Sequence, residues 1–301
     1  MVDTPDHMRE EPEFDIEKPA NDEAVDLPPT RSSAGLWILA IIAVIAAGFA
    51  GYYLVGTAPV TTEVKKVDVP AVPAGDTPAT PAKPLGADAP PVDVPPLDQS
   101  DAVVRSLVKA LSANPRIAAW LATDNLIRNF TVVVANAAEG VTPTKHLGVL
   151  RPTTPFRVIA RGDDVRVDPR SFDRYNELGA AAESVDPAGA ARLYAALKPR
   201  IAEAYRDLGQ PDTAFDRTLE AAIVKLLDVP QVDGTMRLKV HGATGYAFVD
   251  PVLENLSPVQ KQLLRTGPDN VRKIQAALRA MAVSLGIPES RLPATRTLRV
   301  R

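Results

Sequence analysis

Residues 36–55 read LWILAIIAVIAAGFAGYYLV, and this stretch decides how the chain is organised. No charged residue occurs from residue 32 to residue 62, and aromatic residues lie at both ends of the apolar stretch. A helix of about 20 apolar residues, with a rise of roughly 1.5 Å per residue, crosses a hydrocarbon core of about 30 Å. It also satisfies its own backbone hydrogen bonds, and aromatic rings favour the headgroup region. We therefore predict a single transmembrane helix over residues 34–56.

The flanks of this segment favour an uncleaved anchor over a signal peptide. A signal peptide begins with a short basic region, whereas about 30 acidic and proline-containing residues come first here. Lys18 and Arg31 precede the segment, Lys65 and Lys66 follow it, and Arg31 lies closest to its edge. Because positive charge favours the cytoplasmic side, we expect a cytoplasmic N-terminus, an anchor in the inner membrane and a periplasmic C-terminal domain.

One face of the predicted span carries small residues at a spacing of four: Ala43, Ala47 and Gly51. Such a stripe allows two helix backbones to approach closely, so a homodimer through the span is one hypothesis. Because alanine is common in membrane spans, a monomeric span is the alternative.

The segments on either side of the span lack the apolar side chains that a core requires. Residues 1–33 contain ten acidic residues and few large apolar ones, so we predict a disordered acidic tail. Residues 57–96 contain ten prolines. Because proline lacks an amide donor and fixes its own torsion, we predict an extended linker there. The chain has no cysteine, which excludes disulfides and cysteine nucleophiles.

Residues 97–288 are predicted to form one globular domain dominated by helices. Apolar residues recur at helical spacing over 103–111 and 126–137, and we expect Asp124 and Gly140 to cap the second of these helices. Further helices are expected to start at proline: Pro115, Pro187, Pro258 and Pro268. We expect Pro199, inside the helix that begins at Pro187, to kink or split it.

Two stretches predict β-structure. The sequence FRVIARGDDVRVD, residues 156–168, alternates on both sides of a glycine-containing turn, which indicates a β-hairpin. MRLKV at 236–240 and YAFVD at 246–250 indicate a second one. The predicted fold class is therefore mainly α, of the α+β type, with two small β-hairpins and a basic tail over 289–301.

Three stretches of this domain carry a family resemblance: Arg174–Tyr175, AYRDLGQPDTAF at 204–215, and FVDPVLENLSPVQKQLLRTGPDN at 248–270. Over roughly residues 97–285 the chain resembles a bacterial family, the domain-of-unknown-function family numbered 3014. The resemblance implies one N-terminal span followed by a Pro-rich linker. It implies no established activity.

Few residues suggest catalysis or metal binding. His146 and His241 lack the companions of a catalytic triad, and no metal-ligand or phosphate-binding motif occurs, so no cofactor is expected. Two carboxylate pairs, Glu203 with Asp207 and Asp250 with Glu254, lie four residues apart and are the candidates for acid–base chemistry. For the second pair, helix capping by Asp250 and a favourable interaction of Glu254 with the helix dipole are the competing explanation.

Charge is distributed unevenly along the domain. Residues 261–301 hold nine basic residues against two acidic ones, and Arg296, Arg299 and Arg301 could attract an anionic lipid or wall polymer. Aromatic residues for stacking are missing there, so nucleic acid is not an expected partner. Five arginines between 157 and 174 alternate with acids, which favours a salt-bridged surface over an anion site.

These observations lead to two hypotheses of function. The first is a single-pass membrane-anchored envelope protein that presents a non-enzymatic binding or scaffolding module to an envelope partner. The second is an envelope hydrolase that uses one of the carboxylate pairs.

Overall fold

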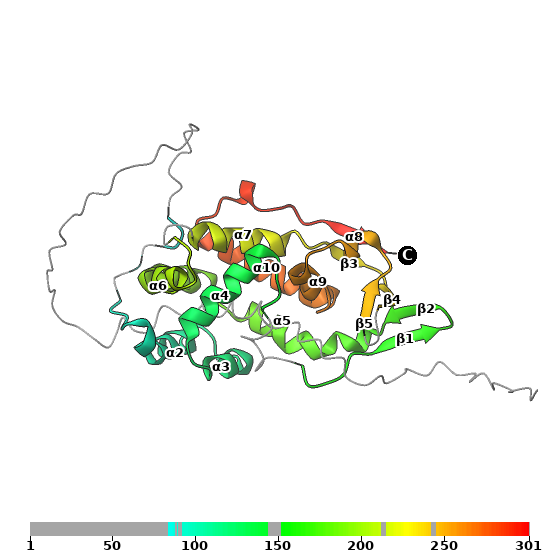
Figure 1. Cartoon of the computed structure of the whole chain (residues 1–301), viewed down its shortest axis with the longest axis horizontal. Coiled ribbons are helices and arrows are strands. Elements are labelled where there is room, and N and C mark those ends of the chain that lie inside the picture. The colour runs from blue at the N-terminus through cyan, green and yellow to red at the C-terminus, as the bar shows by residue number, and fades with distance from the viewer. Residues whose placement is uncertain are drawn as a thin grey trace, which may run out of the picture.

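The computed structural model describes residues 84–87, 89, 92–143, 152–211, 215–241 and 245–300 (Figure 1). The predictions for the acidic tail, the transmembrane helix over 34–56 and its dimer face lie outside the described residues. Within the described ranges, no helix combines the length and the apolar character that crossing a membrane requires.

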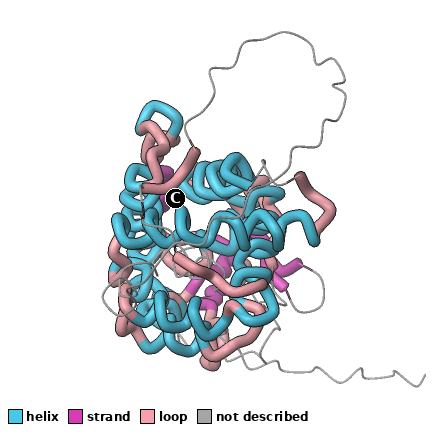
Figure 2. The backbone as a smooth tube through the Cα atoms, turned by 90° about the vertical axis from the view of Figure 1, so that its left-hand side faces the viewer, coloured by secondary structure: helices cyan, strands magenta, loops and turns pink. Residues whose placement is uncertain are grey.

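Helices make up most of the described domain, which confirms the mainly helical prediction (Figure 2). Their bounds are α2 (Asp101–Lys109), α3 (Pro115–Leu121), α4 (Leu126–Glu139), α5 (Asn176–Glu183), α6 (Pro187–Asp207), α7 (Phe215–Leu227), α8 (Pro251–Glu254), α9 (Pro258–Leu264) and α10 (Pro268–Ser284). Helices α4, α6, α7 and α10 pack against one another and α10 also packs on α5. The ring of Phe215 lies in this core, 5.7 Å from that of Phe130 and 5.1 Å from that of Tyr205. The apolar faces that the 3.6-residue period predicts for these helices therefore pack into one core.

Helix termini agree with most of the predicted start and stop signals. Asp186 accepts hydrogen bonds from two amides at the start of α6, and Gly140 ends α4 with a φ of 82°. The prediction that Asp124 caps α4 is wrong. Instead the carboxylate of Asp101, in α2, accepts from the amides of Asn125 and Leu126 at 2.7 and 2.9 Å. The cap comes from a neighbouring helix, which sequence spacing does not reveal.

Pro199 lies inside α6 and does not split it, because the helix is continuous from Pro187 to Asp207. A proline in a helix interior removes one intrahelical hydrogen bond. The buried Leu197 and Ile201 on either side of it anchor both halves in the core. We infer that this packing outweighs the lost bond.

The two predicted hairpins exist but form one sheet. Strands β1 (Val158–Arg161) and β2 (Asp164–Val167) form the first hairpin, and β4 (Arg237–His241) and β5 (Gly245–Phe248) form the second. Strand β2 pairs antiparallel with β4, so the strand order is β1-β2-β4-β5. The sheet lies at one end of the molecule, away from α2, α3 and α6 (Figure 1).

A parallel pair of strands was not predicted: β3 (Gln231–Asp233) pairs with β6 (Thr297–Arg299). Strand β6 lies in the region that the sequence analysis assigned to a basic tail. The C-terminal end of the chain is therefore part of the domain as far as residue 300. Each of the two strands has three residues, too few for a reliable period-two pattern.

Part of the predicted linker also belongs to the domain. Leu85 and Val94 are buried in the core. The Leu85 amide donates to Asp216 Oδ2 at 2.9 Å, and the Gly86 amide donates to the Leu285 carbonyl at 2.9 Å. Arg200 donates to the carbonyl of Val94. We call residues 84–96 the N-terminal strap, of which 84–87, 89 and 92–96 are described.

Candidate functional site

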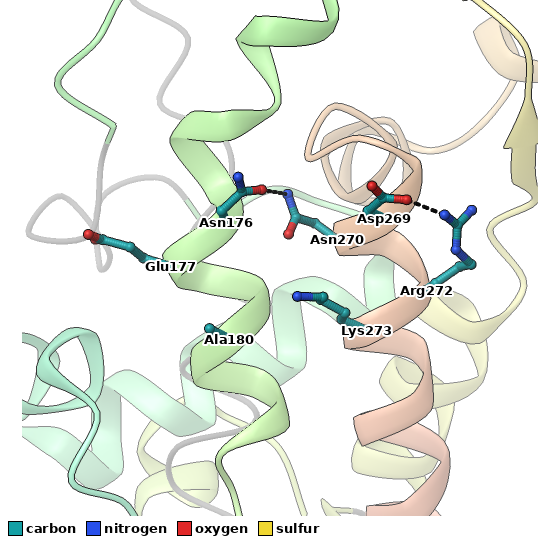
Figure 3. Close-up of a pocket in the computed structure, with 7 residues that line it drawn as sticks. All are labelled: Asn176, Glu177, Ala180, Asp269, Asn270, Arg272 and Lys273. Atoms are coloured by element: carbon teal, nitrogen blue, oxygen red, sulfur yellow. Dashed lines mark hydrogen bonds and ion pairs between the residues drawn. The ribbon is translucent and has the colours of Figure 1, made fainter.

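A pocket of about 650 Å³ lies between the first turns of α5 and α10, and we call it the α5–α10 pocket. The two helices run side by side in the same direction, and Asn176, Asn270 and Lys273 lie between them (Figure 3). The residues that line it are Asn176, Glu177, Ala180, Asp269, Asn270, Arg272 and Lys273.

The turn before α10 brings that helix close to the segment before α5. Gly267 precedes α10 with a φ of 93°, a conformation that glycine adopts without strain. The ring of Phe172 packs directly on Gly267, and a Cβ atom there would overlap the ring. Pro268 then occupies the first helical position, where no amide donor is needed. These contacts set the spacing between the two walls of the pocket.

Asn270 forms the floor of the pocket and connects its two walls. Its side chain is only 2% exposed. The Nδ2 atom of Asn270 lies 3.1 Å from the Asn176 Oδ1 atom, 2.9 Å from the carbonyl oxygen of Thr266 and 3.3 Å from that of Phe172. Gly179 faces the Oδ1 atom of Asn270, and a Cβ at Gly179 would overlap that atom. The side chain of Asn270 is therefore held by contacts on three sides.

The rim of the pocket carries both signs of charge. Asp269 pairs with Arg272, Glu177 pairs with Arg116 of α3, and Lys273 Nζ lies 3.3 Å from a carboxylate oxygen of Glu183. The N-terminal ends of both helices add partial positive charge from amides without intrahelical partners. Hydrogen-bond donors and acceptors thus surround an open pocket, an arrangement suited to binding a polar ligand or a polar protein segment.

The structure assigns a structural contact to each carboxylate of the two candidate pairs. Asp250 accepts from the amides of Val252 and Leu253 at 2.8 and 3.4 Å and so caps α8. On α6, Glu203 pairs with Arg200 at 2.9 Å and Asp207 with Arg128 at 3.4 Å. Neither pair lines the α5–α10 pocket.

Glu254 holds α8 between a strand and a helix. Its carboxylate accepts from the Phe248 amide of β5 and from Lys261 Nζ of α9, both at 2.8 Å. Burial raises the pKa of Glu254, but these hydrogen bonds and the charges of Lys261 and Arg265 outweigh burial, so the pKa lies below its ordinary value. Glu254 is therefore held ionised, which is the opposite of what a general acid needs.

Of the two histidines of the domain, only His241 belongs to the described part of the chain. His146 lies outside the described residues, and His241 ends strand β4, where its backbone pairs with Gly245. Within the described part of the chain, no group of three or more His, Asp or Glu side chains is arranged to hold a metal ion.

Five of the nine basic residues between 261 and 301 form ion pairs with acids of other elements. The ion pairs are Lys261 with Glu254, Lys273 with Glu183, Arg291 with Glu220, Arg296 with Asp228, and Arg299 with Asp233. Arg301 lies outside the described residues. Acids from other elements thus offset part of the positive charge in this region of the sequence.

Sequence reasoning missed the residues that form the pocket. Asn176 and Asn270 are ordinary polar residues near helix starts, and no motif distinguishes them. One signal was present: Gly179 stands inside a helical segment, where glycine costs about 1 kcal/mol relative to alanine and often marks a close contact.

The comparisons identify the family of the chain. A model of the family described as protein of unknown function (DUF3014) matches residues 126–282, so the chain belongs to this family. The match runs from the start of α4 into α10 and includes both walls of the α5–α10 pocket. Searches of curated proteins and of solved structures gave no match.

Proposed function

We propose that this chain is a single-pass membrane-anchored envelope protein whose helical domain is a binding or scaffolding module, with the α5–α10 pocket as its binding site. The observation that carries the binding role is the pocket itself, whose floor is held by the hydrogen bonds of Asn270 to both walls. A side chain that is already held in place loses little conformational entropy when a partner binds. The partner that we propose is another envelope protein.

The position of the pocket relative to the strap supports this role. Gly86 bonds to the Leu285 carbonyl at the C-terminal end of α10, whereas the pocket lies at the N-terminal end of the same helix. At 1.5 Å per residue, α10 separates the two by about 24 Å. A membrane tether that enters through the strap would therefore leave the pocket accessible at the other end of the helix.

The anchor and its orientation can be tested by fractionation. The charge-free segment 36–55 supports the span, and Arg31 at its edge supports a cytoplasmic N-terminus. We expect the full-length chain to stay in the membrane pellet after an alkaline carbonate wash. We also expect a periplasm-dependent reporter fused after residue 301 to be active. Release into the supernatant, or a reporter active only in the cytosol, would contradict the proposal.

The pocket can be tested by photocrosslinking in cells. A photoreactive amino acid in place of Arg272 lies in the pocket, and one in place of Val283 lies on the same helix near its other end, where the side chain is 46% exposed. We expect a protein adduct from position 272 and not from position 283, identified by mass spectrometry.

A pocket-filling variant provides the control for this experiment. Ala180 is exposed and lines the pocket, so Ala180→Trp should fill it without disturbing the core. The adduct from position 272 should then disappear while the far-ultraviolet circular dichroism spectrum is unchanged. Equal adducts from both positions, or an adduct that Ala180→Trp leaves intact, would overturn the pocket as the binding site.

A further inference from the structure

The side-chain oxygen of Asn270 is an unused hydrogen-bond acceptor in the α5–α10 pocket. The Nδ2 atom of Asn270 lies within 3.3 Å of three oxygens of the chain, which decides which end of the amide is the oxygen. Among the described residues, no group donates a hydrogen bond to Oδ1. The fully buried side-chain atoms without a hydrogen bond belong to other residues in this part of the chain, so Oδ1 reaches the pocket. A ligand that fits here brings a donor to this oxygen.

Lys273 places a hydrogen-bond donor beside this acceptor. A Cβ placed at Gly179 would lie 2.4 Å from Asn270 Oδ1 and 3.2 Å from Lys273 Cδ, so the two side chains meet over this glycine. Figure 3 shows both side chains between α5 and α10. Lys273 is 41% exposed, and its Nζ lies 3.3 Å from one carboxylate oxygen of Glu183. Because an ammonium group has three N–H donors, Lys273 retains donors for a ligand.

The charges of the pocket do not favour an ion as the ligand group. Two lining residues are acidic, Glu177 and Asp269, and two are basic, Arg272 and Lys273. The two acids lie in the first turns of α5 and α10, where they already balance the helix dipoles. A neutral group that both donates and accepts hydrogen bonds is therefore the best match to the pocket.

We propose that the α5–α10 pocket binds a primary carboxamide, the side chain of an asparagine or glutamine in a segment of the partner protein. Its N–H donates to Asn270 Oδ1, and its oxygen accepts from Lys273 Nζ. A primary carboxamide carries both groups on one edge, whereas the N–H and C=O of a trans peptide unit point in opposite directions. This inference rests on the proposed function, because it takes the pocket as the binding site for a protein. The competing explanation is that Asn270 and Lys273 only join the two helices.

Small probes test this chemistry without changing Asn270, whose Nδ2 contacts hold the helices together. The chain has no cysteine, so Ala180→Cys provides a single thiol in the pocket that can carry a trifluoromethyl label for fluorine NMR. The full-length chain is titrated in detergent with N-acetylglutamine methylamide. We expect a saturable change of chemical shift at position 180, with half-saturation in roughly the millimolar range for a probe of this size. The same label at Val283→Cys, near the other end of α10, should not respond.

Two analogues of the probe separate the donor from the acceptor. N-acetylglutamate methylamide replaces the amide with a carboxylate, and the analogue with a dimethylated side-chain amide keeps the oxygen but has no N–H there. We expect both to bind about tenfold more weakly, because Asn270 Oδ1 then receives no hydrogen bond. Lys273→Met keeps the apolar stem and removes the donor, so it should weaken binding of the glutamine probe by about tenfold as well. Lys239→Met is the matched control, because Lys239 is exposed on β4 and does not line the pocket.

The proposal is overturned if the glutamine probe causes no saturable change at position 180, or if Lys273→Met leaves its binding unchanged. It is also overturned if either analogue binds as tightly, or if N-acetylglucosamine does, because the amide of that sugar is secondary. Photocrosslinking from position 272 reports separately on the proposed function. An adduct without a response to the glutamine probe would keep the protein partner and remove the carboxamide. A response without an adduct would keep the carboxamide as the ligand group and remove the protein partner.

Discussion

At the scale of single residues, the pocket depends on where side chains are small. Gly179 and Gly267 lack a Cβ at the two points where α5 and the segment before it meet α10. The Oδ1 atom of Asn270 lies against Gly179 of α5, and the ring of Phe172 lies against Gly267, which precedes α10. Close packing of this kind leaves no space for one additional methyl group. The two glycines therefore decide how near the walls of the pocket come.

Gly179→Ala tests this contact. An alanine in a solvent-exposed helix position raises stability by roughly 0.5–1 kcal/mol over glycine. Here the added methyl group overlaps Asn270 Oδ1, so we expect the free energy of unfolding to fall by about 1–3 kcal/mol. Urea denaturation monitored by circular dichroism measures the change.

The matched control for this variant is a double-mutant cycle with Asn270→Ala, which removes the oxygen that the methyl group overlaps. Asn270→Ala should cost less in the Gly179→Ala background than in the wild type. If the two substitutions changed the free energy of unfolding additively, the added methyl group would not overlap the Asn270 side chain.

At the scale of elements, turns and helix starts are specified by adjacent residues, whereas the pairing of elements depends on residues far apart in the chain. Each hairpin forms from two stretches of alternating apolar and polar residues separated by a short turn, so the sequence pattern predicts it. The pairing of Val165 with Leu238 unites the hairpins across more than 70 residues, and no local pattern predicts that register. The Glu254 carboxylate likewise connects α8 to β5 and α9 through contacts that only the assembled fold brings together.

The linkage through Glu254 predicts a dependence of stability on pH. Its pKa lies below the ordinary value of 4.5, so the unfolded chain binds this proton at a higher pH than the folded protein does. The contribution of the Glu254 carboxylate to the free energy of unfolding is complete above the ordinary pKa of 4.5. It is lost as the pH falls through the lower pKa of the folded state. The stability difference between wild type and Glu254→Gln should therefore be largest near pH 7 and shrink below about pH 4.5.

Urea denaturation over a series of pH values between about 7 and 3 measures this difference. Glu289→Gln, at an exposed position near the C-terminus, is the control and should show little difference at any pH. A difference between wild type and Glu254→Gln that stays constant with pH would contradict the electrostatic role of Glu254.

At the scale of the whole molecule, the domain is closed by segments near both ends of the described chain. The strap places Leu85 and Val94 in the core, and β6 pairs with β3. Asp216 accepts from the Leu85 amide, from the Tyr194 hydroxyl and from Lys198, so one carboxylate ties the strap to α6 and α7. The folded unit therefore extends beyond residues 97–288 at both ends.

Truncation tests the contribution of the strap. A chain that begins at residue 84 keeps the strap, whereas a chain that begins at residue 97 exposes the surface that Leu85 and Val94 cover. Because burying each aliphatic side chain contributes about 1.5–3 kcal/mol, we expect the shorter chain to be less stable by about 3–6 kcal/mol. Chemical denaturation of both chains measures this, and equal stability would show that the strap adds nothing to the core.

The candidate site illustrates how far sequence reasoning reaches. The stretches that carry the family resemblance include Tyr175 and residues 265–270, and the fold brings them to the same junction. The spacing of four residues also identified the two carboxylate pairs as candidates. Spacing alone does not show that Asp250 caps a helix or that Asp207 pairs with Arg128. Which polar groups are paired is decided by neighbours that are distant in sequence.

By itself, the sequence determined the helices, their proline starts, Gly140 as a helix end and the two hairpins. These features follow from the periodicity and chemistry of adjacent residues. Only the tertiary structure decided that the hairpins form one sheet, that the strap and β6 belong to the domain, and that a pocket opens between α5 and α10. The physical reason is that burial, ion pairing and close packing depend on contacts between residues far apart in the chain, which local patterns do not encode.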